Sequence, residues 1–279
     1  MEHLTSEIVA SRAIAYDEHY LTAGWRPRRW TNETAGAFLS YILDSVQEGH
    51  INGNEIQRAL QIVGAPALAG KYVLDYCCGT GISAIYFALC GAMVMAFDRS
   101  PAAVRIASES ARQSGVEDKV RFSVADARML PYRSNAFDAV FCQSALHIVA
   151  DYPECAGELA RVLRPGAKAV FCEEALGYNL VLGIFRFIGR RTWRKCGGRP
   201  LTYPEIRKFG TKFSRTIIHH FNLLGQTKNL LGDRALRNGP LAVQLRSGLR
   251  AVERVDGLLL AHVPALRVLC GKVVVEYIR

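Results

Sequence analysis

The distribution of apolar and polar residues along the chain predicts seven strands separated by helices. Short apolar runs that are rich in β-branched and aromatic residues predict the strands. Apolar residues at helical spacing predict the helices, and the first helix after a strand is predicted at 82–90. This order is typical of an α/β fold built on a mostly parallel sheet. The predicted strands are 72–76, 94–98, 120–124, 137–142, 168–172, 215–221 and 272–278.

The predicted strands divide the chain into three parts. Residues 1–70 precede the first strand and are expected to form an N-terminal helical cover. Residues 71–174 hold the first five strands and are expected to form the core that carries the site. Residues 175–279 contribute the last two strands to the same sheet, together with helices that we expect to select the substrate.

Several helices are predicted outside the strands. Apolar stripes at 37–46 and 54–63 predict two helices in the N-terminal cover, and the helix before the fifth strand is expected to end at Gly166. Residues 175–199 alternate apolar bulk with arginines, which predicts a lid or an amphipathic surface helix. An ordinary helix packed on the sheet is the alternative for this segment. A basic helical pair is expected at 241–260.

A glycine turn follows the first strand directly. The strand ends in an acidic residue, Asp75, and Gly79 and Gly81 allow the backbone to turn tightly before the next helix. A strand, a glycine turn and a helix N-terminus in this order form a pocket for a nucleotide. Cys77 stands where a first glycine is expected. Cysteine is tolerable there if its φ angle is negative, because residues other than glycine disfavour positive φ.

Two families share this arrangement. A dinucleotide fold needs G-x-G-x-x-G/A, which residues 79–84 satisfy, and Asp98 at the end of the next strand would then bind ribose. The carboxylate of Asp75 disfavours a pyrophosphate and favours an ammonium or sulfonium group. Residues 72–84 therefore resemble the first motif of class I S-adenosylmethionine-dependent methyltransferases of the small-molecule type. A nicotinamide-dependent oxidoreductase is the alternative enzyme.

Further motifs of the same family follow in register between about residues 70 and 175. The resemblance implies a Rossmann-like sheet of seven strands, in which the last strand inserts antiparallel between the fifth and sixth. It also implies S-adenosyl-L-methionine as the cofactor and S-adenosyl-L-homocysteine as the product. In the family, an acid matching Asp98 binds the ribose hydroxyls, and one matching Asp126 binds the adenine amino group. The expected cofactor-binding residues are Tyr16, Asp75, Cys77, Gly79, Gly81, Asp98, Arg99, Asp126, Ala127 and Gln143.

Each of these residues also has a purely structural interpretation. The glycines could cap a turn, Asp98 could cap a helix, and Asp126 could close an Asx turn. Tyr16, the candidate to close over the cofactor, could equally pack in the core. The acids are more informative together, because they end successive strands at the edge of a parallel sheet where ligands bind in open α/β folds.

Methyl transfer from a sulfonium depends mainly on orientation, because the donor is already activated. Alignment of the reacting atoms contributes about 7–11 kcal/mol, and a general base adds roughly 100-fold or more for a hydroxyl or protonated amine. Residues after the fourth strand face the methyl group in this family, and His147 could accept the proton of the acceptor. A buried structural histidine is the alternative. Glu173 and Glu174 are further groups that could hold an ammonium or a sugar hydroxyl.

The composition of the chain bears on its cellular compartment. Half of the 279 residues are hydrophobic, which is enough for the core of one large domain. The most apolar stretch, 175–189, carries Arg186 and falls short of the roughly 20 residues needed to span a bilayer. The acidic start of the chain differs from a signal peptide. Eight cysteines without a C-x-x-C pair favour a reducing compartment and no metal site. We therefore expect a cytoplasmic protein.

Charge is distributed unevenly along the chain. Residues 175–279 hold 19 Lys and Arg against 5 Asp and Glu, whereas residues 1–174 hold 16 against 20. Such asymmetry points to an anionic partner, which could be a membrane surface, a nucleic acid or an acidic substrate. A solvated basic face without a partner is the alternative.

The main hypothesis is methyl transfer to a small, amphiphilic or lipid-like molecule by in-line displacement, such as a secondary metabolite, a quinone or a lipid precursor. Residues 175–279 would contact an anionic membrane peripherally. An RNA methyltransferase that uses the basic face is less favoured, because the Asn-Pro-Pro-Tyr motif of nucleobase enzymes is absent. A methyltransferase-like binding scaffold is a third hypothesis, because of Cys77. The sequence does not predict the oligomeric state.

Overall fold

The chain is described by a computed structural model, in which residues 6–22, 24–31, 54–173, 177–179, 199–225 and 242–279 are defined. Two sequence predictions lie outside these residues: the helix at 37–46, and all of the amphipathic segment 175–199 except residues 177–179 and Arg199. No helix among the described residues has the length and apolar content needed to cross a membrane.

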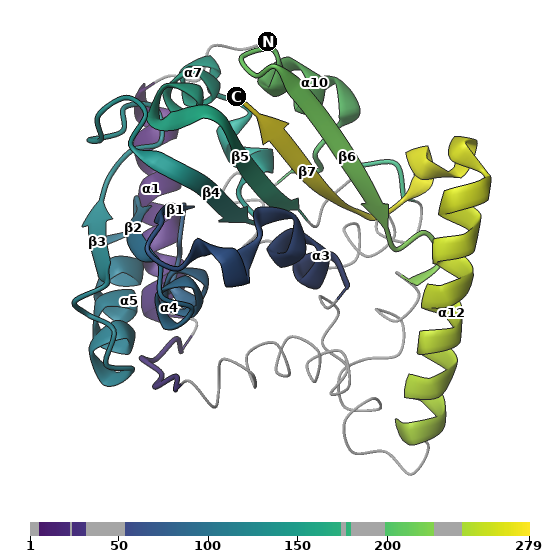
Figure 1. Ribbon diagram of the computed structural model, residues 1–279, viewed down its shortest axis with the longest axis horizontal. Coiled ribbons are helices and arrows are strands. Elements are labelled where there is room, and N and C mark those ends of the chain that lie inside the picture. Colours follow the sequence, from purple (N-terminus) through teal and green to yellow (C-terminus); the bar gives the residue numbers. More distant parts are fainter. Residues whose placement is uncertain (1–5, 23, 32–53, 174–176, 180–198, 226–241) are drawn as a thin grey trace.

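A seven-stranded sheet forms the centre of the molecule (Figure 1). Its strand order is β3-β2-β1-β4-β5-β7-β6, and β7 runs antiparallel to both of its neighbours. The predicted seven-stranded, mostly parallel sheet is therefore confirmed, including the insertion of the last strand between the fifth and the sixth. The strands are β1 (Tyr72–Tyr76), β2 (Met93–Asp98), β3 (Val120–Val124), β4 (Phe137–Gln143), β5 (Leu163–Glu173), β6 (Arg215–Phe221) and β7 (Lys272–Ile278).

Helices cover both faces of the sheet (Figure 1). One face packs against α3 (Asn54–Val63), η1 (Ala65–Leu68) and α4 (Ile82–Leu89), with α5 (Pro101–Gln113) beside them. The other face packs against α6 (Leu146–Val149), α7 (Pro153–Val162) and α10 (Tyr203–Gly210). Because both faces are covered, the central strands are apolar on both sides, and all but the first residue of β1 is buried.

Two predictions about helices were wrong: the end of one helix, and the division of another into a pair. The helix expected to reach Gly166 ends at Val162, because Leu163 already has extended backbone angles and begins β5. The predicted helical pair at 241–260 is a single helix, α12 (Ala242–His262), which continues through the glycines at 248 and 257. It is followed by η3 (Pro264–Leu269). Isolated glycines weaken a helix without necessarily ending it.

A buried ion pair joins the N-terminal cover to the sheet. The ammonium of Lys272, at the start of β7, contacts the carboxylate of Glu55 in α3, and the side chains are 3% and 1% exposed. Two such charges are costly to bury singly but compensate each other as a pair. The pair helps to hold α3 against the carboxyl end of β5, where β7 begins.

Candidate active site

A cavity of about 530 Å³ lies at the carboxyl ends of β1, β2 and β4. This volume is within the range of small-molecule sites. Helix α1 (Ser6–Thr22) contributes residues to the cavity wall and packs against α5. The structure brings together most of the residues predicted for the site. Those that line the cavity are Tyr16, Asp75, Cys77, Gly79, Asp98, Arg99, Asp126, Ala127 and Gln143.

The cavity begins at the turn after β1, where three residues have positive φ. Their φ angles are 57° at Cys77, 52° at Gly79 and 77° at Gly81. Cys77 therefore does not have the negative φ that would make cysteine unstrained, and the turn imposes the left-handed conformation that glycine usually supplies. The turn is fixed by its backbone, since the amide of Cys78 donates to the carbonyl of Phe97 at 2.8 Å.

The two glycines are needed for space as well as for conformation. A Cβ atom at Gly79 would lie 2.8 Å from the hydroxyl oxygen of Tyr20, on α1. A Cβ atom at Gly81 would lie 2.7 Å from the Cβ of Ala107 and 2.8 Å from the ring of Phe122. Gly81 thus lies behind the cavity wall, where it lets α4 begin close to α5 and β3. Its predicted contact with a cofactor would be indirect.

Asp75 is the most unusual group of the site. Its side chain lies on the cavity wall, yet the residue is only 2% exposed, and Oδ2 has no hydrogen-bond partner among the described residues. Burial raises the pKa of Asp75 to about 7, although a hydrogen bond from the Ala84 amide opposes this shift. A buried carboxylate with an unused oxygen is suited to a cationic ligand.

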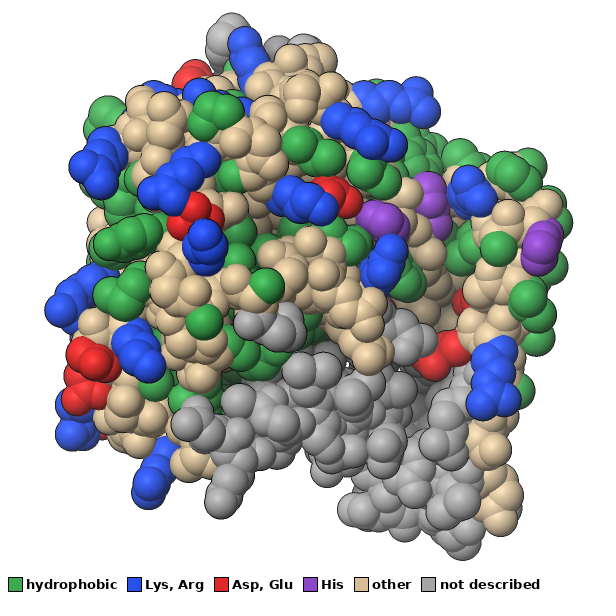
Figure 2. All heavy atoms as spheres, viewed as in Figure 1, with side chains coloured by type: hydrophobic (Ala, Val, Ile, Leu, Met, Phe, Trp, Pro, Cys, Tyr) green, Lys and Arg blue, Asp and Glu red, His purple; other side chains and the backbone are tan. Residues whose placement is uncertain are grey.

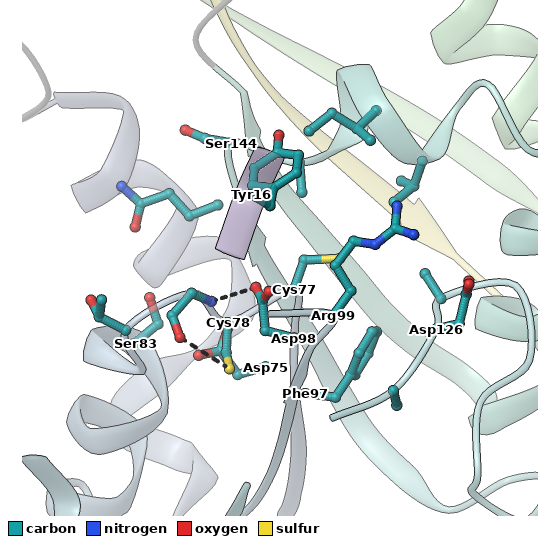
Figure 3. Close-up of a pocket in the computed structure, with 18 of the residues that line it drawn as sticks. Tyr16, Asp75, Cys77, Cys78, Ser83, Phe97, Asp98, Arg99, Asp126 and Ser144 are labelled. Atoms are coloured by element: carbon teal, nitrogen blue, oxygen red, sulfur yellow. Dashed lines mark hydrogen bonds between the residues drawn. The ribbon is translucent and has the colours of Figure 1, made fainter. Parts of the chain in front are cut away.

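Asp98 holds the glycine turn against the end of β2 (Figure 3). Its Oδ2 accepts a hydrogen bond from the Gly79 amide and its Oδ1 one from the Ser100 amide, both at 2.9 Å. Burial raises the pKa of Asp98, and these backbone hydrogen bonds oppose the shift. Each carboxylate oxygen has a further lone pair. The same side chain can therefore hold the turn and accept hydroxyl groups of a ligand.

Asp126 is already engaged by a neighbouring side chain. The Arg128 guanidinium donates to its two oxygens, with Nε–Oδ1 at 3.0 Å and Nη2–Oδ2 at 2.7 Å, and the Arg128 amide closes a turn on Oδ1. Burial alone would raise the pKa of Asp126, but the hydrogen bonds from Arg128 outweigh it and the pKa is lowered. Arg128 also lies 5.4 Å from the centre of the Tyr152 ring. An adenine amino group would share this carboxylate with Arg128.

His147 does not reach the cavity wall. It lies in α6, is 4% exposed, and is not among the residues that line the cavity. The geometry therefore gives no support to the proton-accepting role predicted for it. Glu173 ends β5, and Glu174 lies outside the described residues.

The sequence analysis missed the aromatic residues that α1 and its continuation bring to the site. His19, Tyr20 and Trp25 line the cavity, with ring centroids 5.4 Å apart for His19–Tyr20 and 6.1 Å for Tyr20–Trp25. Tyr16 and Tyr20 are four residues apart, so they share a helix face, and this spacing could have identified Tyr20. His19 is thus the histidine that lines the cavity in the described part of the chain.

Comparison with known proteins identifies the fold. Residues 74–171 match the family model described as "Methyltransferase domain". These residues form a class I methyltransferase domain. The match runs from within β1 to within β5, and it includes the ends of β1, β2 and β4 that build the cavity. The match favours the methyltransferase hypothesis over the nicotinamide-dependent oxidoreductase.

Two relatives show the extent of the similarity. A 2-phytyl-1,4-naphtoquinone methyltransferase of Synechococcus elongatus is 32% identical over 143 residues, which are 50% of this chain and 61% of the relative. The methyltransferase GfsG of Streptomyces halstedii is 36% identical over 106 residues, 38% of either chain. This chain thus spans less than two thirds of the curated relatives it matches.

A solved structure with a similar fold is the phosphoethanolamine N-methyltransferase 2 of Haemonchus contortus. Its TM-score is 0.55 at 18% identity, and the superposition covers 81% of this chain and 52% of that one. The similarity extends beyond residues 74–171, so it includes parts of the fold outside the matched domain.

The strain at Cys77 can be measured by comparing two small replacements. Cys77→Gly and Cys77→Ala both remove the thiol, but only alanine keeps a Cβ at positive φ. We expect the glycine variant to be more stable than the alanine variant by about 1 kcal/mol. Urea unfolding of both variants measures this difference. An alanine variant as stable as the glycine variant would show that the turn carries no strain at this position.

The burial of Asp75 makes stability dependent on pH. Its pKa is about 7 in the folded protein and near the ordinary 3.8 when unfolded. The folded state therefore binds more protons between these values, and the contribution of Asp75 to stability falls as pH rises from about 4 to 7. Asp75→Asn should match the wild type near pH 4 and exceed its unfolding free energy by up to about 4 kcal/mol at pH 8. A variant less stable than the wild type at pH 8 contradicts the prediction.

Proposed function

We propose that the protein transfers a methyl group from S-adenosyl-L-methionine to a small amphiphilic molecule, releasing S-adenosyl-L-homocysteine. The observation that carries this proposal is the buried carboxylate of Asp75 on the wall of the cavity in a methyltransferase domain, whose Oδ2 has no hydrogen-bond partner among the described residues. Burying the charge of the Asp75 carboxylate is destabilising on its own. A cationic ligand in the cavity would offset this cost.

The residues around the cavity fit this cofactor. Asp75 Oδ2 would accept a hydrogen bond from the ammonium group, and the Asp98 carboxylate would accept those of the ribose hydroxyls through its remaining lone pairs. Asp126 and the backbone of Ala127 would contact the adenine at the other side of the cavity. Tyr16 and Tyr20 supply aromatic surface from α1.

When bound, the cofactor supplies a methyl group that its sulfonium has already activated. The chain's own residues then contribute orientation and exclusion of water. The turn at 77–81 and the carboxylates beside it fix one side of the cavity, and α1 limits access of solvent from the other. Such positioning contributes about 7–11 kcal/mol in well-oriented reactions. Of the histidines considered, His19 is better placed than His147 to accept a proton from a hydroxyl acceptor.

The acceptor class rests on the relatives and on the C-terminal third. One relative is named for a phytyl naphthoquinone and another for demethylmenaquinone, and a third is a 27-O-demethylrifamycin SV methyltransferase. These names are those of small molecules, two of them quinones. A quinone, lipid precursor or secondary metabolite is therefore our proposal for this chain, with residues 175–279 selecting it.

Binding of S-adenosyl-L-homocysteine tests the cofactor half of the proposal. Calorimetric titration should show binding to the wild type, and Asp75→Asn should bind at least tenfold more weakly, because it removes a charge-assisted hydrogen bond. The loss would be specific if the same variant gains stability at pH 8. Wild-type protein that fails to bind would refute the proposal and favour the scaffold hypothesis.

The proposed class of methyl acceptor is tested by incubating the protein with isotopically labelled S-adenosyl-L-methionine and fractionated cell extract. Label should enter quinone, lipid or metabolite pools and should require Asp75. Label that enters RNA instead would support the RNA alternative and overturn the proposed substrate class.

Peripheral contact with an anionic membrane is part of the proposal. Exposed apolar side chains concentrate along α12 and η3, on the right of Figure 2. On α12, Val255 and Leu258 are 46% and 61% exposed, and the inner face of the helix instead buries Asp256 and Leu260. The exposed set continues with Val263, Val268 and Leu269. An apolar surface in a strongly basic segment is suited to an anionic bilayer.

Sedimentation with vesicles tests this contact. The wild type should bind vesicles that contain phosphatidylserine more strongly than vesicles of phosphatidylcholine alone, and Leu258→Glu should weaken binding at least fivefold. Ile14→Glu is a matched control, because Ile14 is also 61% exposed on a helix, α1, at the other side of the molecule. Equal loss in both variants, or no vesicle binding by the wild type, contradicts the contact.

A further inference from the structure

Four alternating charges connect α1 to the segment that enters α10. Arg12 of α1 donates from Nη1 to Oδ2 of Asp151 at 3.2 Å. Arg199 donates from Nε to Oδ1 of the same carboxylate at 3.0 Å, and from Nη1 to Oε1 of Glu205 at 2.5 Å. The side chains of these residues are 16% to 30% exposed. A network at this depth is less screened than isolated surface pairs.

Asp151 is the centre of this network. It lies in the turn between α6 and α7, between cavity-lining residues Val149 and Tyr152. Its two oxygens accept from arginines that are 139 and 48 residues distant in sequence. Arg199 holds one oxygen, so the other is oriented toward α1. The carboxylate thus joins three segments at one end of the cavity.

The far end of the network is fixed by a helix cap. Oε2 of Glu205 accepts hydrogen bonds from the amide and the hydroxyl of Thr202, at 2.9 and 2.7 Å, and Thr202 is the N-cap of α10. The same carboxylate therefore caps α10 and holds Arg199 with its other oxygen. Arg199 is thus attached to a rigid part of the fold, because Leu201 and Ile206 beside it are fully buried.

Helix α1 has a second attachment, which joins it to the start of α5. Oδ1 of Asp17 accepts hydrogen bonds from the hydroxyl of Ser100 and the amide of Ala102, at 2.6 and 2.8 Å, at the start of α5. Tyr16 lies between the two attachments in sequence, and it lines the cavity. The position of its ring therefore depends on both ends of this helical stretch.

We propose that Asp151 is a positioning residue that holds α1 over the cofactor cavity through Arg12, with Arg199 orienting its carboxylate. The proposal rests on the proposed function only in naming the ligand. Asp151 itself does not line the cavity. Asp151 acts by keeping Tyr16 and Tyr20 in place on the cavity wall. Because α1 is already ordered in the free protein, less conformational entropy is lost when the ligand binds.

Hydrogen exchange tests the positioning without any ligand. Arg12→Gln and Asp151→Asn should each increase amide exchange in residues 6–22 several-fold, and the double variant should add little to Asp151→Asn alone. Arg112→Gln is the control for loss of an arginine–carboxylate pair elsewhere, because it breaks the more exposed pair with Glu109 on α5, away from the cavity. Unchanged exchange in α1 of Arg12→Gln would overturn the proposal, whether or not the protein binds a cofactor.

Ligand measurements separate positioning from a general loss of structure. Arg12→Gln should weaken S-adenosyl-L-homocysteine binding about tenfold and raise the KM for the donor, with kcat at saturating donor unchanged. Arg12→Lys keeps the charge and should recover part of the affinity. A fall in kcat without a change in KM, or no recovery by lysine, would contradict positioning through this pair. Absence of binding by the wild type would refute the proposed function and leave the exchange result to decide this proposal.

Discussion

Parallel pairing of β1 with both β2 and β4 is the constraint on which the site depends. Asp75 stands opposite Ala96 on one side and Phe141 on the other. With this register, the acid at the end of β1 comes next to the ends of β2 and β4, so that Asp75, Asp98 and Gln143 reach the same edge of the sheet. In parallel sheets the carboxyl ends of neighbouring strands meet in this way, and a ligand placed there contacts several loops at once.

The same constraint explains why the site is strained and electrostatically unfavourable when considered alone. Because β1 is buried on both faces, the Asp75 carboxylate at its end has little contact with solvent. This burial disfavours the charged form of the carboxylate. The chain must then turn at once toward α4, which places Cys77 at positive φ. Both costs occur on the cavity wall, while the strands behind it are apolar and well packed. Local costs that occur together at a cavity are typical of binding sites.

The sequence predicted the sheet well, because each strand is a short apolar run with clear turn residues around it. β1, β3, β6 and β7 have the predicted bounds, and the others differ mainly at their ends. The positions of Asp75, Asp98 and Asp126 followed from the same pattern, since each comes at or just after a strand end. What periodicity could not give is the contact between distant segments. Tyr20 reaches Gly79 only because α1 folds across the cavity.

Side-chain pairing was the other limit of sequence reasoning. The order of residues offered an Asx turn at Asp126 and a buried His147 only as alternatives. It could not show that the Arg128 guanidinium would also bind Asp126, or that His147 would be buried in the short helix α6. The four-charge network from Arg12 to Glu205 spans nearly 200 residues and depends on the final packing of three segments. Such contacts are decided by tertiary structure, whereas the strands are decided locally.

The position of α1 depends both on its local helical spacing and on tertiary contacts. Its residues 12, 16, 19 and 20 recur at helical spacing and thus share a face. The direction of that face is set by Arg12 and Asp17, both inside the helix, through hydrogen bonds with Asp151 and with the start of α5. An apolar contact alone would leave the helix free to slide, because it is non-directional. Hydrogen bonds to fixed carboxylates have defined geometry, so they determine which residue lies over the glycine turn. Polar contacts at the rim of the cavity therefore add direction to the apolar packing of Tyr16 against the core beneath it.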